Sequence, residues 1–263
     1  MRQATVASGR FISRGRLALR SAYWLASLVV PRGADRPAPV TAGVVREIDA
    51  LGVGALRLVT VSALLVGLIT VFQVAYQLAP YGAELVSARA IAWFVAREIG
   101  PIVVAMLVVA RSAAAIAGEF ASMSANGEID ALRVMGLDPV KYLVVPKLGA
   151  LLVALPALTA IAIVLAVIGG WVGTSVVLGF NTALYLQHLT ESLTMRDVGV
   201  GLGKSLMFAV LIAIIAADEG LRVERRVSAI GAAATRAVVF CLVGVLAADT
   251  VVNAIVYFIP GLT

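Results

Sequence analysis

The chain has 263 residues, of which 61% are hydrophobic and only 14% are charged, and its mean hydropathy is +1.01. Such a composition indicates an integral membrane protein rather than a soluble domain. The net charge of +6 does not by itself indicate a nucleic-acid partner, because the cations of a membrane protein are distributed by loop and have to be assigned loop by loop.

Residues 1–56 are predicted to form a basic N-terminal region. Nine of the 21 Lys and Arg residues precede residue 58, where the first clear span begins. Residues 11–30 mix arginines with bulky apolar side chains, which is typical of an amphipathic helix in the membrane interface. Residues 40–56 are expected to lead into the first span as an elbow helix. The competing interpretation of residues 11–30 is a signal peptide, but its apolar core would be short and no convincing cleavage site follows.

Five apolar segments have the roughly 20 residues that a helix needs to cross about 30 Å of hydrocarbon. They are residues 58–78, 99–118, 148–174, 198–217 and 237–258. The strands of a membrane barrel would instead alternate in polarity over roughly 10 residues. We therefore predict an all-α integral membrane protein with five transmembrane helices, in which residues 57–263 form one five-span domain.

An odd number of spans places the two ends of the domain on opposite sides of the membrane. The N-terminal cations place that end in the cytoplasm, since positively charged segments stay inside. Segments 127–147 and 218–236 then also lie in the cytoplasm, and they carry seven further Lys and Arg residues. The outer segments, 79–98 and 175–197, carry only three. The charge bias therefore agrees with the number of spans.

The third apolar region leaves an alternative open. Residues 148–190 contain no Asp, Glu, Lys or Arg and are about twice as long as one crossing requires. Glycines interrupt the second half of this region, and a sixth span would move the basic segment 218–236 to the outside. We expect one crossing followed by an amphipathic outer segment.

A polar island, residues 126–139, separates the second span from the third. Asn126 can cap a helix at its N-terminus, and Gly136 suits a left-handed exit at its C-terminus. Asp138 followed by Pro139 is typical of the start of another helix. The island is therefore predicted to contain a short helix parallel to the membrane.

This short helix is expected to have an apolar stripe and a polar side. The stripe consists of Ile129, Leu132 and Met135, and the polar residues are Glu128, Asp130 and Arg133. A helix of this kind is too short to be a domain and indicates a contact with a cytoplasmic partner. The alternative is a solvated turn between two spans.

Several sequence motifs occur in one order along the chain. They are REIGP at 97–101, ARSAAAIAGEF at 110–120, EIDALRVMGLDP at 128–139, YLVVPK at 142–147, KS at 204–205 and GAAATRAVV at 231–239. Together they resemble the MlaE/YrbE permeases of ABC-type lipid transporters that work with MCE proteins. The resemblance extends from about residue 40 to the C-terminus.

The resemblance implies a homodimeric permease in a bacterial inner membrane, with the helix between spans two and three as a coupling helix docked on a cytoplasmic ATPase of the MlaF type. It also implies phospholipid as the cargo. The lipid would pass to or from a periplasmic MCE protein of the MlaD type and so affect outer-membrane lipid asymmetry. A STAS-domain protein is a candidate accessory subunit. ATP and Mg would be used by the partner, and this chain itself is expected to bind no cofactor.

Three charged residues are candidates for the outer mouth of a lipid path. Arg97 and Glu98 open the second span, and Lys204 lies near the outer end of the fourth. Because a buried charge needs a partner, Glu98 and Lys204 are expected to pair across the helix bundle. One interpretation is that they hold the mouth of a cavity or meet a headgroup phosphate, and the other is an ordinary interfacial ion pair.

Two further polar residues lie inside predicted spans. Arg111 has alanine neighbours that permit close helix packing, and it is interpreted as a structural partner of Glu119 or Asp218, with lipid contact as the alternative. Asp249 interrupts the last span. It is interpreted as a satisfied buried polar residue, because an ion relay would need a chain of such groups.

A lipid cavity needs apolar walls rather than a catalytic cluster. The candidate wall residues, on the first span and just beyond it, are Leu68, Val71, Phe72, Tyr76, Leu78 and Tyr81. The alternative for this stripe is a surface that faces lipid or a neighbouring helix.

The sequence lacks the usual motifs of an enzyme. No G-x-x-x-x-G-K-[ST] loop occurs, so the chain is not expected to hydrolyse ATP itself. His188 is the only histidine and Cys241 the only cysteine, so neither a metal centre nor a nucleophile–base pair is expected. The functional alternatives are an ion-coupled secondary transporter, which would need acidic relays or inverted repeats, and a structural subunit that anchors a partner.

Overall fold

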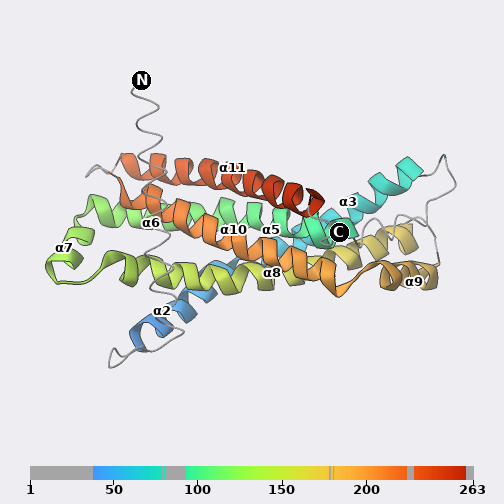
Figure 1. Cartoon of the computed structure of the whole chain (residues 1–263), viewed down its shortest axis with the longest axis horizontal. Helices are drawn as coiled ribbons and strands as arrows, with labels where there is room; N and C mark the ends of the chain where they lie inside the picture. Colours follow the sequence, from blue (N-terminus) through green and yellow to red (C-terminus); the bar gives the residue numbers. More distant parts are fainter. Residues whose placement is uncertain are drawn as a thin grey trace, which may run out of the picture. The chain divides into compact units, whose positions relative to one another are not determined.

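The computed structural model describes residues 38–78, 80, 93–177, 179, 181–223 and 228–258. Within these residues the chain is helical and has no strands (Figure 1), which confirms the predicted all-α class. The predicted interfacial helix at 11–30 and Tyr81 lie outside the described residues, as does the side chain of Leu78.

The described residues form nine α-helices and several π-helical turns. The long ones are α3 (Gly54–Leu78), α8 (Val145–Trp171), α10 (Met195–Leu221) and α11 (Ala229–Phe258). The shorter ones are α2 (Ala38–Ile48), α5 (Gly100–Val108), α6 (Ala114–Ala125), α7 (Glu128–Val134) and α9 (Thr182–Ser192). Single π-helical turns extend or join them: η1 (Asp49–Val53), η3 (Val95–Ile99), η4 (Val109–Ala113), η5 (Val140–Val144) and η6 (Val172–Val177). Such turns often occur at functional sites, and η3 and η4 carry Glu98 and Arg111.

Five of these helical stretches are long and apolar enough to cross a membrane, which confirms the predicted number of spans. They run over Gly43–Gln77, Val95–Ala125, Val140–Val176, Met195–Leu221 and Ala229–Val256. Each is longer than the predicted segment. The prediction ended spans at charges and glycines, whereas the helical backbone continues through such residues.

The third apolar region crosses once, as predicted, and is followed by α9. The side chain of Asn181 caps α9 by accepting a hydrogen bond from the Ala183 N–H at 2.8 Å. Tyr185 of α9 is buried, and its hydroxyl donates to the Val167 carbonyl at 3.0 Å. Burial raises the pKa of Tyr185 to about 12. These contacts attach α9 to the end of the third span.

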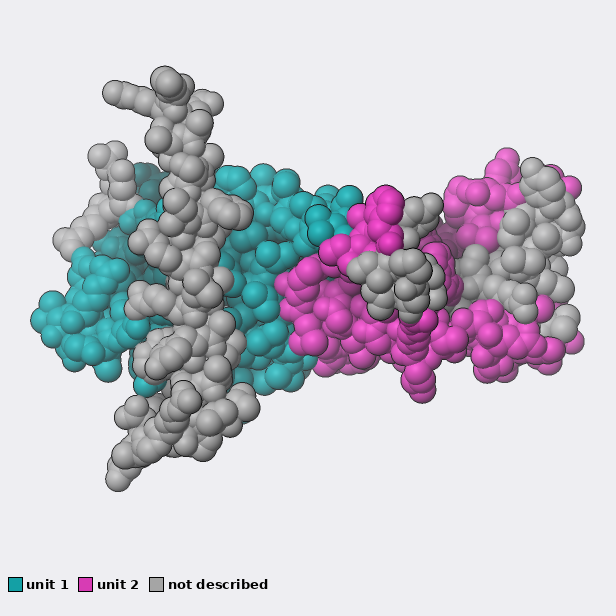
Figure 2. Space-filling model, viewed as in Figure 1, with its two compact units in different colours: residues 1–53, 108–154, 208–251 teal, residues 54–107, 155–207, 252–263 magenta. Residues whose placement is uncertain are grey.

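The chain divides into two compact units, shown in teal and magenta in Figure 2. Unit 1 consists of residues 1–53, 108–154 and 208–251, and unit 2 of residues 54–107, 155–207 and 252–263. Each unit contains a buried lysine that is bound to carboxylates of the same unit, Lys147 in unit 1 and Lys204 in unit 2.

In unit 2, α3 and α8 approach each other at glycines. A Cβ atom added to Gly67 would lie 1.9 Å from the Ala166 carbonyl oxygen, and one added to Gly169 would lie 2.2 Å from the Leu64 carbonyl oxygen. Both contacts are with backbone atoms, which cannot move without shifting a helix. Small residues at such crossings are what lets membrane helices pack closely.

We expect Gly67→Ala to destabilise the protein by about 2 kcal/mol or more, because the new methyl group would push α3 away from α8. Thermal unfolding of the detergent-purified protein measures the change. Gly199→Ala in α10 is the control, since a Cβ there meets no atom within 4 Å. Equal unfolding temperatures for the two variants would show that the α3–α8 contact is looser than described.

Candidate functional site

The connection between the second and third spans is built by α7 (Figure 1). Gly127, with φ of 77°, takes the left-handed conformation that turns the chain from α6 into α7. The prediction that Asn126 caps α7 is wrong. Asn126 ends α6, and its side-chain amide donates to the Glu128 carboxylate at 3.3 Å rather than accepting from the helix backbone. The residue that turns the chain into α7 is Gly127, which follows Asn126.

The C-terminal end of α7 is as predicted. Gly136 is left-handed, with φ of 76°, and the N–H of Leu137 donates to the Leu132 carbonyl at 2.9 Å. The Asp138 carboxylate then accepts from the Val140 N–H at 3.0 Å, and Pro139 opens the next helical stretch. Glycine and aspartate therefore fix both the end of α7 and the start of η5.

The surface of α7 differs from the predicted stripe. Ile129 and Leu132 are buried, whereas Met135 is 63% exposed. Steps of three residues each rotate by about 60° around a helix, so Met135 stands roughly 120° from Ile129. Val134, at 88%, and Leu137, at 43%, are exposed with Met135. Ile129 and Leu132 therefore anchor α7 to its own chain, and a second apolar surface remains outside.

The polar residues of α7 contribute little to its stability. Arg133 donates to the Asp130 carboxylate at 2.9 Å, with both side chains about half exposed or more. An exposed pair of this kind is worth less than about 1 kcal/mol. These residues are available to a binding partner, and their predicted role in coupling stays a prediction.

Unit 1 also contains a buried cluster around Lys147, which sequence reasoning missed. The Lys147 ammonium group donates to both oxygens of Glu47 at 3.0 Å and to Glu119 at 2.8 Å. It also lies 5.6 Å from the centre of the Phe120 ring. One buried cation thus joins α2, α6 and α8. The only sequence signal was its place in the YLVVPK motif at 142–147.

The predicted pairing of Glu98 with Lys204 is confirmed in unit 2. The Lys204 ammonium group lies 2.7 Å from both Glu98 oxygens and donates to the Asn253 amide oxygen at 2.6 Å. Asn253 in turn donates to Glu98 at 3.0 Å. The Lys204 side chain is 1% exposed. The three side chains close a triangle between η3, α10 and α11, and their proposed role in a lipid path stays a prediction.

Arg97 stands beside this triangle in sequence but has other partners. It lies 3.7 Å from the Asp197 carboxylate and 5.3 Å from the centre of the Trp93 ring. Asp197 accepts hydrogen bonds from the backbone N–H and the hydroxyl of Thr194 and so fixes the first turn of α10. Both cations of the candidate mouth are therefore neutralised by carboxylates of the same unit.

The interpretation of Arg111 as a partner of Glu119 or Asp218 is wrong. Arg111 donates to the Ala50 carbonyl of η1 at 3.0 Å. Glu119 is bound to Lys147 and Asp218 to Arg222, at 2.8 Å and 2.7 Å. The register of the π-helical turn η4 directs Arg111 toward η1 instead. Asp249 is 7% exposed, as expected of a buried polar residue of the last span.

The predicted wall residues do not share one surface. Val71 is fully buried in a core cluster with Val95 and Ala166. Phe72 and Tyr76 are exposed, at 37% and 82%, and Leu68 packs near Gly173. A stripe read from sequence alone contains no information on which helix covers it.

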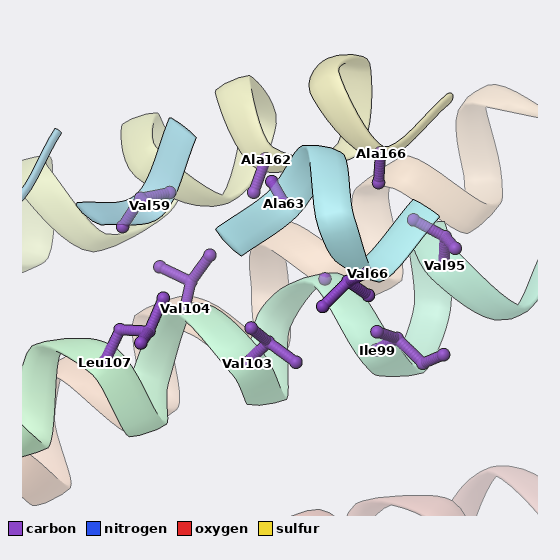
Figure 3. Close-up of a pocket in the computed structure, with 11 residues that line it drawn as sticks. Val59, Ala63, Val66, Val95, Ile99, Val103, Val104, Leu107, Ala162 and Ala166 are labelled. Atoms are coloured by element: carbon purple, nitrogen blue, oxygen red, sulfur yellow. The ribbon is translucent and has the colours of Figure 1, made fainter. Parts of the chain in front are cut away.

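The apolar pocket of unit 2 lies on another face of α3 (Figure 3). Val59, Ala63 and Val66, spaced by four and three residues, share this face and point toward the residues of α5 and α8. The cavity between them has a volume of about 10 Å³, roughly enough for one water molecule. The remaining lining residues are Val95, Ile99, Gly100, Val103, Val104, Leu107, Ala162 and Ala166. All are apolar, so the cavity offers no catalytic group.

Among the residues that the structure describes, no group of three or more His, Cys, Asp or Glu side chains could hold a metal ion. Cys241 is buried, and its thiol faces the Ile212 carbonyl at 3.8 Å.

Comparisons with known proteins agree with this geometry. The model of the family described as Permease MlaE matches residues 44–255. A Rickettsia conorii protein named as a probable ABC transporter permease is 31% identical over 204 residues, which cover 78% of this chain and 79% of that protein.

Two other relatives carry names that refer to lipids. The intermembrane phospholipid transport system permease protein MlaE of Haemophilus influenzae is 27% identical over 81% of this chain and 82% of that protein. The chloroplast protein TRIGALACTOSYLDIACYLGLYCEROL 1 of Arabidopsis thaliana is 29% identical over 63% of this chain and 47% of that protein.

Proposed function

The chain belongs to the MlaE permease family, and from this premise we propose that it is the membrane subunit of an ATP-driven transporter that moves phospholipid. That the chain is a multi-pass permease of the ABC transporter type follows from the family and the five spans. Phospholipid as the cargo is supported by the name of the Haemophilus influenzae relative.

The observation that carries this proposal is the group of exposed apolar residues at the C-terminal end of α7. This coupling surface consists of Val134, Met135 and Leu137. A soluble turn between two spans has no physical reason to hold such side chains in water, and an exposed apolar patch marks an interaction site. We assign it to a cytoplasmic ATPase of the MlaF type, which would supply the ATP and Mg chemistry that this chain lacks.

The contacts of unit 1 support a route for the ATPase movement. Ile129 and Leu132 attach α7 to its own chain, and α6 precedes it while η5 and α8 follow. Lys147 joins α6 and α8 to α2. Because a packed and ion-paired block moves as a rigid body, a push on the coupling surface would reach the second and third spans together.

The proposed assembly is a homodimer with a periplasmic MCE protein of the MlaD type and a STAS-domain accessory protein. The first and last spans support a second copy, since only 28% and 17% of their most apolar windows are buried, compared with 44–50% in the other three. These surfaces are available to another subunit or to lipid. We place the protein in a bacterial inner membrane with its N-terminus in the cytoplasm, where the basic segments stay.

The apolar pocket and the pairing of each buried cation with a carboxylate support a lipid rather than an ion as the cargo. An ion pathway would need a chain of polar groups across the spans. The pocket is lined by apolar residues alone, and each of Lys204 and Arg97 already faces a carboxylate. An apolar lining of this kind offers an ion no polar ligand and is compatible with contact to an acyl chain.

We expect Val134→Asp combined with Met135→Asp to reduce co-purification of the ATPase at least about ten-fold. Two charges would enter an apolar contact, and each lost apolar side chain is worth roughly 1.5–3 kcal/mol. The fold should survive, because both residues are exposed. The measurement is the ratio of ATPase to permease after affinity purification of the membrane complex.

The control is Met195→Asp, which changes a 91% exposed methionine at the start of α10, away from the coupling surface in the sequence. It should leave the ratio unchanged. The proposal fails if both variants retain the ATPase equally, or if the chain alone moves lipid between liposomes without ATP.

A further inference from the structure

Arg111 is exposed although it lies near the middle of the second span. This span, Val95–Ala125, has 31 residues, so Arg111 is more than about 20 Å along the helix from either end. A cation at such a depth is expensive and needs a compensating partner. The question is which group supplies it.

The chain itself supplies only part of the compensation. One of the five N–H donors of the Arg111 guanidinium is bound to the Ala50 carbonyl, at 3.0 Å. Arg111 forms no ion pair with any residue that the structure describes, and the two acids predicted as its partners, Glu119 and Asp218, are held by other cations. Residues 1–37 contain one acid, Asp35, and seven arginines, so that segment offers little negative charge.

The surface around Arg111 is open and lined by small residues. Ala110 and Ala115 are exposed on the same stretch of helix. A Cβ atom added to Gly118, two helical turns further on, would meet no atom within 4 Å. An acyl chain can therefore lie against this surface without displacing a side chain.

A second copy of the chain is a poor occupant of this surface where the two-fold axis passes close to Arg111. A residue on the axis of a two-fold symmetric contact meets its own copy, so Arg111 would there approach the identical arginine. Two like charges in a medium of low dielectric repel strongly. A small anion, in contrast, fits both the charge and the remaining N–H donors.

We propose that Arg111 binds the phosphate group of the transported lipid inside the membrane, with the Ala50 carbonyl holding the guanidinium in position. This inference rests on the proposed phospholipid transport and assigns the residue that binds the phosphate within the membrane. A planar guanidinium binds phosphate oxygens in pairs. A galactolipid without phosphate, of the kind that the name of the chloroplast relative suggests, cannot neutralise the charge.

The test uses the full complex with its ATPase in nanodiscs. The nanodiscs contain either phosphatidylglycerol or digalactosyldiacylglycerol, in a neutral lipid background without phosphatidylcholine. Native mass spectrometry counts the lipid that remains bound to the permease. Arg111→Gln should lower the apparent affinity for phosphatidylglycerol about ten-fold or more, because a charge-assisted hydrogen bond is lost, and should not affect the galactolipid. Arg111→Lys should retain part of the affinity. Arg46→Gln, the same change at an exposed position of α2, should retain all of it.

Three results would overturn the inference. Phosphatidylglycerol could bind to the Arg111→Gln variant as tightly as to the wild type. The variant could also fail to dimerise while it keeps its lipid, which would assign the surface to a second copy. The bound lipid could also exchange at the same rate with and without ATP, as a boundary lipid would. Failure of the wild-type complex to move any lipid would instead refute the proposed function, and it would be visible before any Arg111 variant is compared.

Discussion

Lys204→Met is expected to destabilise the protein by about 3–5 kcal/mol, the usual cost of removing one partner from a buried ion pair. The Lys204 side chain is 1% exposed, and its ammonium group contacts both Glu98 oxygens and Asn253. Its loss leaves a carboxylate in apolar surroundings with only the Asn253 amide to stabilise it. Thermal unfolding of the detergent-purified variant measures the effect.

The double variant Glu98→Gln with Lys204→Met separates a structural pair from a functional one. Without either charge the buried site has no unpaired ion, so most of the lost stability should return. If the pair only holds helices together, ATP-driven lipid transfer by the complex should return with it. If the pair belongs to the lipid path, the double variant should fold and still fail to transfer lipid. A double variant as unstable as Lys204→Met would contradict the pairing itself.

The features predicted correctly depend on local properties of the sequence. The spans follow from runs of apolar residues, and the C-terminal end of the island follows from Gly136 and Asp138, whose backbone preferences act within a few residues. The pairing of Glu98 with Lys204 was also predictable. Each is a charge near the same expected end of a span, and burial leaves such charges few alternatives.

The features that were missed depend on contacts between distant segments. Lys147 was counted only as a cytoplasmic cation, because its partners Glu119 and Glu47 are 28 and 100 residues away. The acceptor of Arg111 is a backbone carbonyl in a π-helical turn, and no residue type signals such a turn. The exposure of Met135 depends on the helix ending at Val134, one residue earlier than the predicted stripe required.

The same distinction explains why the apolar pocket of unit 2 is lined by other residues of α3 than the predicted wall residues. The wall residues were chosen as a bulky stripe, but small residues such as Ala63 and Gly67 decide how closely neighbouring helices approach. The close approach at Gly67 buries Val71 nearby, and the space opens beside Val59 and Val66 instead. The position of a cavity depends on the small residues of a span, which a hydropathy profile does not distinguish from the large apolar ones.

Lys147→Met is expected to cost about 3 kcal/mol and to uncouple ATP hydrolysis from lipid movement. The Lys147 side chain is 6% exposed, and removing it leaves the 14% exposed carboxylate of Glu47 without its cation. The contacts of α7 are untouched, so the ATPase should still bind. However, α2 would no longer be tied to α6 and α8, and a push on the coupling surface would move fewer helices together. ATPase activity and lipid transfer by the reconstituted complex, measured in parallel, reveal the uncoupling.

Two variants show whether this effect comes from the lost link or from general damage. Lys147→Arg keeps the cation and should retain both stability and coupling. Glu119→Gln removes the half-exposed partner and leaves Lys147 bound to Glu47, so it should cost less than about 1 kcal/mol. If Glu119→Gln uncouples transport as fully as Lys147→Met while α2 stays attached, the α6–α8 contact transmits the movement and α2 has no part in it. Because α6 leads directly into α7, the movement would then pass from the coupling surface through α7, α6 and α8 without α2. It would still start at the coupling surface.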